Sequence, residues 1–135
     1  MGYFLPTAFQ LGIQEVDDQH HALVDLTNVC ADLIEAGQEK DACPPLKKFI
    51  HLLEDHFHKE EAMMERMGYP GLDWHREHHA DALRVTQKVF DTCRANEQIT
   101  AGDIADLFNN VIMDIVRADL KFAEYLEGRG DLRRP

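Results

Sequence analysis

Hydrophobic residues recur three or four positions apart in four successive segments of this chain, which is the spacing of amphipathic α-helices. No segment shows the strict alternation of a half-buried strand. Short turns join the segments, so consecutive helices are expected to run antiparallel. The sequence therefore predicts an all-α fold, an up-down-up-down four-helix bundle. The predicted helices cover about residues 17–37, 45–67, 72–95 and 101–127.

The first 14 residues lack a helical period and contain Pro6 and Gly12, so we expect residues 1–14 to form an extended N-terminal arm over the bundle. The first helix is expected to start with an aspartate N-cap in Val16-Asp17-Asp18. At 135 residues the chain has the length of one domain, and residues 1–135 are predicted to form a single one.

Six polar residues interrupt the hydrophobic stripes and share their inward face. Burying their carboxylates costs several kcal/mol each unless positive charge accompanies them, and the stripes contain no Lys or Arg. Bound metal ions are the predicted compensation, and a metal-free histidine–carboxylate hydrogen-bond network is the alternative. Imidazole and carboxylate ligands favour iron, zinc or manganese over calcium or magnesium. The candidate ligands are His20, His56, Glu60, His75, His79 and Asp119.

The ligand spacing supports this interpretation. His56 and Glu60 are four residues apart, as are His75 and His79, so each pair lies on one face of its helix. Gly68-Tyr69-Pro70-Gly71 separates the two pairs and predicts a tight turn between neighbouring helices. The other four histidines fall on polar faces and are assigned no role: His21, His51, His58 and His78.

Composition excludes several classes of partner. The net charge of −11 opposes binding to nucleic acids and to anionic membrane surfaces. No apolar run reaches the roughly 20 residues that span a bilayer, and the N-terminus does not resemble a signal peptide. Cys30, Cys43 and Cys93 show no pairing pattern, so we expect three reduced thiols and a cytoplasmic location.

These residues lie in segments by which the chain resembles the hemerythrin family, specifically its single-domain bacterial members, from about residue 4 to 126. The segments are V-D-D-Q-H-H-A-L, H-F-H-K-E-E-A-M-M, G-Y-P, H-R-E-H-H and D-I-V-R-A-D. The resemblance implies a centre of two iron ions with an oxo or hydroxo bridge, one of which binds O2. The implied ligands are His20 and His56 for the O2-binding iron, His75 and His79 for the other, and Glu60 and Asp119 as bridges.

One position departs from the family's last motif, H-x-x-x-x-D, because Asp114 stands in place of the histidine. Residues five apart lie about 140° apart around an α-helix, so both side chains would have to reach in from its flanks. Asp114 therefore binds the second iron directly, binds it through water, or leaves it one ligand short. If Asp114 binds, its charge favours Fe(III), and the oxygenated state is expected to decay faster.

The function that the resemblance implies is reversible O2 binding, for transport, storage or local supply, without catalytic residues. One alternative is a di-iron enzyme that reduces O2 or peroxide, which oxidation promoted by Asp114 would favour. The chain lacks the Glu-x-x-His pairs of ferritin-like enzymes. A third candidate is a sensor module for O2 or NO. A fourth is a mononuclear zinc site, although Arg76 occupies the glutamate position of H-E-x-x-H.

Overall fold

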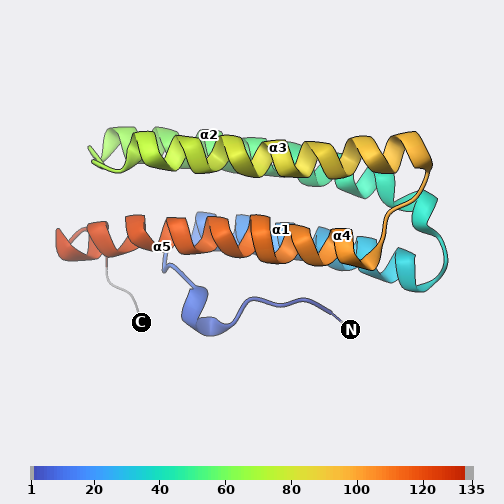
Figure 1. Cartoon of the computed structure of the whole chain (residues 1–135). Helices are drawn as coiled ribbons and strands as arrows, with labels where there is room; N and C mark the ends of the chain where they lie inside the picture. The colour runs from blue at the N-terminus through green and yellow to red at the C-terminus, as the bar shows by residue number, and fades with distance from the viewer. Residues whose placement is uncertain (1, 133–135) are drawn as a thin grey trace.

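The chain folds into four antiparallel helical rods, as the hydrophobic pattern predicts (Figure 1). The computed structural model describes residues 2–132, and Met1 and residues 133–135 of the predicted domain lie outside them. Within residues 2–132 there are no strands, and the all-α prediction is confirmed. The rods are α1 (Gln14–Glu35), α2 (Cys43–Arg66), α3 (Leu72–Asn96) and a fourth that contains α4 (Ala101–Asp106) and α5 (Met113–Gly128).

The N-terminal arm runs along the bundle and includes a short 3₁₀ turn at Thr7–Phe9 (Figure 1). Helix α1 begins earlier than predicted, at Gln14, and Ile13 occupies its N-cap position without a side-chain cap. The expected aspartate N-cap was therefore wrong. The Asp17 carboxylate instead reaches back from the first turn and accepts hydrogen bonds from the backbone N–H groups of Leu11, at 2.8 Å, and Gly12, at 3.0 Å. These contacts fasten the arm to α1.

The turn between α2 and α3 sets two neighbouring helices antiparallel. Gly68 has a φ of 65°, the left-handed conformation that glycine adopts without steric cost. A Cβ atom at Gly71 would lie 2.8 Å from the Tyr69 side chain, so a larger residue there would force this side chain to move. This turn brings the C-terminal half of α2 alongside the N-terminal half of α3.

The fourth rod is not a continuous α-helix. A capping box starts α4, in which the Thr100 hydroxyl accepts from the Asp103 N–H and the Asp103 carboxylate accepts from the Thr100 N–H. A π-helical segment, Leu107–Ile112, then separates α4 from α5. Its wider turns shift the angular position of every residue that follows. Regular α-helix resumes at Met113 and places the faces of α5.

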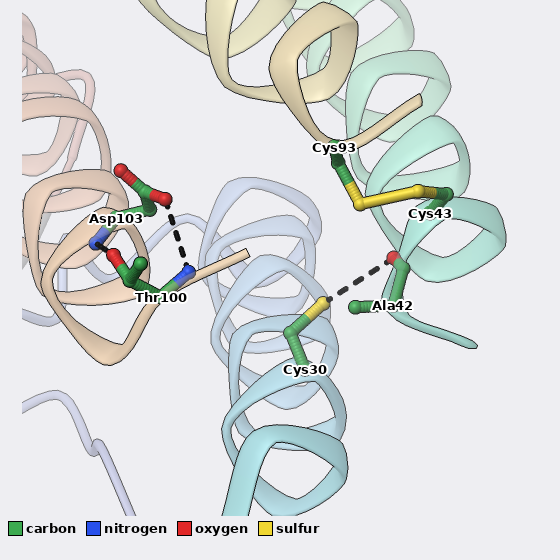
Figure 2. The surroundings of a disulfide bond; sticks show 6 residues. All are labelled: Cys30, Ala42, Cys43, Cys93, Thr100 and Asp103. Carbon is green, nitrogen blue, oxygen red and sulfur yellow. Dashed lines mark hydrogen bonds between the residues drawn. A yellow bond between two sulfur atoms is a disulfide. The ribbon is translucent and has the colours of Figure 1, made fainter. Parts of the chain in front are cut away.

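A disulfide joins Cys43, at the start of α2, to Cys93, near the end of α3 (Figure 2). The prediction of three reduced thiols was therefore wrong. Two residues 50 positions apart meet because α2 and α3 are antiparallel. Cys30 is free and buried, its Sγ lies 3.9 Å from the Ala42 carbonyl, and burial raises the pKa of its thiol to about 11. The cytoplasmic location, which rested on reduced thiols, stays a prediction.

The apolar core has a large part and smaller parts, and the inward polar residues lie between them. The large cluster includes Leu23, Leu53 and Ile115. A smaller cluster of Met64, Phe122 and Leu126 closes the end of the bundle near the Gly68 turn. The polar layer is therefore walled by hydrophobic side chains on both sides. Among residues 2–132, no helix has the length and apolar character needed to cross a membrane.

Candidate metal centre

The structure brings six of the predicted ligands together in the bundle core. Each of the six residues is at least 97% buried, and they come from all four rods. Helix α1 contributes one, α2 two, α3 two and α5 one, and every one lies on the inward face of its helix. The six residues are His20, His56, Glu60, His75, His79 and Asp119.

Asp119 lies between the two histidine pairs. Its Oδ2 is 2.7 Å from Nε2 of His20 and 3.2 Å from Nε2 of His56. Its Oδ1 is 2.7 Å from Nε2 of His75. One carboxylate oxygen thus faces each pair, and we call His20 with His56 the first pair and His75 with His79 the second pair.

Glu60 repeats this arrangement from helix α2. Its Oε1 is 2.7 Å from Nε2 of His75 and 3.1 Å from Nε2 of His79. Its Oε2 is 3.7 Å from Nε2 of His56. Both carboxylates therefore present separate oxygens to the two pairs, which is the placement that a bridging carboxylate requires.

The buried charges interact strongly. Burial lowers the pKa of His75, but hydrogen bonds with Asp119 and Glu60 and their negative charge outweigh it and raise this pKa to about 9. The same balance, with Asp119 as hydrogen-bond partner, raises the pKa of His56. Burial alone would raise the pKa of Asp119, yet its histidine partners hold it well below the usual value. The cluster therefore favours the ionised carboxylate of Asp119 and the protonated imidazoles of His56 and His75.

The donor set fits metal ions. All four imidazoles direct Nε2 at carboxylate oxygens, and two sets of four ligand atoms each lie within 4.8 Å of one another. Glu60 and Asp119 belong to both sets, with the first pair completing one and the second pair the other. Glu60 Oε2, although buried, has no hydrogen-bond partner among the described residues. Imidazole nitrogen with carboxylate oxygen is a donor set for iron, zinc or manganese.

Two further side chains contact the histidines from outside the centre. Nδ1 of His79 donates to Oε2 of Glu61 at 2.7 Å, and Nδ1 of His56 donates to Oε1 of Gln19 in a short hydrogen bond. Such contacts hold a ring in the tautomer whose Nε2 can bind a metal. Nδ1 of His20 and of His75 has no such partner in residues 2–132.

Sequence reasoning missed Gln19 and Glu61. Each is adjacent in sequence to a candidate ligand, so each lies about 100° away from the inward face and is only half-buried. The available signal was a polar side chain flanking a ligand position, because histidine ligands commonly donate their second N–H to such a group.

Asp114 lies outside this buried cluster of six residues. Its side chain is 55% exposed, and Oδ2 lies 3.4 Å from Nδ1 of His78 on α3. The π-helical segment ends at Ile112, so Asp114 and Asp119 are separated by regular α-helix, which turns them about 140° apart. In this geometry Asp114 pairs with His78, and binding of a metal ion by Asp114, directly or through water, stays a prediction.

The remaining histidines lie near or at the surface. His21, His51 and His58 are exposed, as predicted. His78 is half-buried, and its ring centroid lies 4.1 Å from that of Trp74. None of these four histidines reaches the buried centre.

The fold and this cluster define a class: four-helix-bundle proteins whose core combines histidine and carboxylate side chains suited to cations. The family model of the hemerythrin HHE cation binding domain matches residues 11–124. The chain belongs to the hemerythrin family, and the resemblance inferred from its motifs is confirmed.

Named relatives agree with this membership. The chain is 37% identical over 82 residues to a bacteriohemerythrin of Ralstonia nicotianae, a match that covers 61% of this chain and 57% of the relative. It is 30% identical over 82 residues to a myohemerythrin of Theromyzon tessulatum, covering 60% of this chain and 62% of the relative. The chain thus matches less than two thirds of either relative's length. No solved structure matches the chain significantly.

Proposed function

We propose that this chain is a non-haem di-iron protein that binds O2 reversibly, for transport, storage or local supply. The observation that carries the proposal is the position of Glu60 and Asp119, each with one oxygen toward each histidine pair. Membership of the hemerythrin family and the relatives named bacteriohemerythrin and myohemerythrin support it. Two iron ions would supply the electrons that O2 takes up on binding and returns on release.

The side chains have distinct roles in this proposal. The first pair would hold one iron and the second pair the other, with Glu60 and Asp119 shared between them. Gln19 and Glu61 orient one histidine of each pair through Nδ1. The surrounding apolar clusters, including Leu23, Met64 and Phe122, exclude bulk water, which limits proton delivery and so favours release of O2 over its reduction.

Metal analysis combined with visible spectroscopy tests the proposal. We expect two irons per chain and, in the reduced protein, an absorption band that develops under air, disappears on removal of O2 and returns on its readmission. Colourless protein that contains only zinc would contradict the proposal. So would a band that never reverses.

The position of Asp114 favours a second candidate, reduction of O2 or peroxide. Each histidine pair shares the same two carboxylates and gains nothing from Asp114, so each metal ion would have two histidines and carboxylate oxygen as protein ligands. Sites of two histidines and a carboxylate with open positions are typical of oxygen-activating iron. Oxidation promoted by a bound Asp114 would be a different mechanism, which the exposed side chain does not support.

Turnover separates the two candidates. With an electron donor present, an enzyme consumes peroxide or O2 continuously, in proportion to the donor added. A carrier takes up O2 in a fixed ratio to its iron and then stops. We expect O2 uptake in a fixed ratio to iron. Sustained consumption would instead indicate an enzyme that reduces O2 or peroxide.

A further inference from the structure

The outer hydrogen-bond partners of the two histidine pairs differ in charge. His79 of the second pair donates to a carboxylate, Glu61, at 2.7 Å. His56 of the first pair donates to a neutral amide, Gln19. The inner ligands do not share this asymmetry, because each pair has two imidazoles and the same two carboxylates. The charge of the outer partners is therefore one electrostatic difference between the two pairs.

Glu61 is held in place as an ionised carboxylate. Its Oε1 accepts from Nε of Arg76 at 3.1 Å, while its Oε2 accepts from His79. The side chain is 24% exposed, so solvent screens it only in part, and Arg76 is itself about half-exposed. Glu61 comes from α2, whereas His79 and Arg76 come from α3, so the contact also fixes the ring of His79 against the neighbouring helix.

A carboxylate behind a metal-bound imidazole has two effects on metal binding. It fixes the tautomer with Nε2 free to bind, and its negative charge makes the ring a stronger donor. A neutral amide has the first effect without the second. We propose that Glu61 is a positioning residue that makes the second pair bind its metal ion more tightly than the first pair, so that the two ions bind in sequence.

This inference deepens the proposed di-iron function and rests on it. It also explains how the second pair can retain an ion without a ligand from Asp114, since the charge of Glu61 reaches the site through His79. Removing an outer partner of a histidine ligand typically lowers metal affinity about 10- to 100-fold. The expected effect falls on one of the two binding steps.

The test is a titration of the chelator-treated 135-residue chain with Co²⁺, in competition with a chromophoric chelator that resolves two dissociation constants. We expect two steps in the unmodified chain. Glu61→Gln, which makes the outer partners of both pairs neutral, is expected to weaken the tighter step about 10- to 100-fold and merge the two. Gln19→Glu is expected to tighten the weaker step instead.

Glu65→Gln is the matched control. Glu65 is a 74%-exposed carboxylate of α2 that lies 3.9 Å from Arg76, so the variant loses the same charge without touching His79. Thermal unfolding of the metal-free variants checks that they fold. If Glu61→Gln fails to fold, the Co²⁺ affinity of Gln19→Glu at the weaker step tests the inference on its own.

The outcomes separate this inference from the proposed function. Two equivalents bound with equal affinity, or equal effects of Glu61→Gln and Glu65→Gln, would overturn the role of Glu61 and leave the metal centre standing. A failure of Gln19→Glu to tighten the weaker step would do the same. No Co²⁺ or iron bound by the unmodified chain would overturn both.

Discussion

At the scale of single residues, the two buried carboxylates determine the chemistry of the core. Glu60 and Asp119 are almost completely buried and have only imidazoles as close charged partners among the described residues. Isolated carboxylates would be very costly there, so either protonated histidines or metal ions must neutralise them. Protons and metal ions therefore compete for Nε2 of the same rings.

This competition predicts how pH affects the chelator-treated protein. The pKa of His75 rises from its ordinary value of 6.5 to about 9 in the folded chain. Protonated His75 therefore contributes about 3 kcal/mol to the free energy of unfolding. This contribution is complete below pH 6.5 and is lost as the pH rises through 9. Denaturant unfolding at several pH values should show this loss. A free energy of unfolding that stays constant from pH 6 to 10 would contradict the pKa assigned to His75.

A second prediction concerns Asp114. Because Asp114 contacts His78 and not the centre, Asp114→Asn is expected to retain the iron content of the unmodified chain. Elemental analysis of both proteins, purified side by side, gives the comparison. His75→Ala serves as the positive control and should lose metal. Loss of one iron per chain in Asp114→Asn would show that this carboxylate is a ligand after all.

At the scale of helices, hydrophobic periodicity predicted which face of each helix is buried. The inward faces of all four rods, including the six polar positions, follow from the 3.6-residue repeat. The π-helical segment Leu107–Ile112 did not follow, because its sequence is an unbroken continuation of the stripe. Whether Asp114 joins the centre depends on where that segment ends. Contacts between helices, such as that of Glu61 with His79, could likewise not be predicted from a pattern within one helix.

The disulfide between α2 and α3 illustrates the same limit and gives a third prediction. Cys43 and Cys93 pair only because two antiparallel helices end side by side (Figure 2). Replacing both with alanine should lower the free energy of unfolding by about 2–4 kcal/mol, by releasing the constraint on the unfolded chain. The metal content should not change, since the inward histidines lie in the other half of α2 and α3.

Thiol counting provides the control for this prediction. The denatured, unreduced chain should contain one reactive thiol, Cys30, and the reduced chain three. In the native state Cys30 should react slowly, because it is buried and its thiol pKa is about 11. Three thiols without reductant would contradict the disulfide.

At the scale of the whole molecule, the bundle supplies rigidity around a polar layer. Apolar clusters lie on both sides of the layer, the Gly68 turn aligns α2 with α3, and Asp17 ties the N-terminal arm to α1. Ligands from four separate rods can converge only when all rods are in register. Metal binding and folding are therefore expected to stabilise each other.

Glu60 and Asp119 belong to both sets of candidate ligands, and we propose that they would be shared by two metal ions, one beside each histidine pair. Anomalous diffraction from crystals of the iron-loaded protein, measured on either side of the iron absorption edge, tests it most directly. We expect two iron peaks, one next to His20 and His56 and one next to His75 and His79, with both carboxylates between them. A single peak, peaks at the surface, or Glu60 and Asp119 turned away from the metal would contradict it.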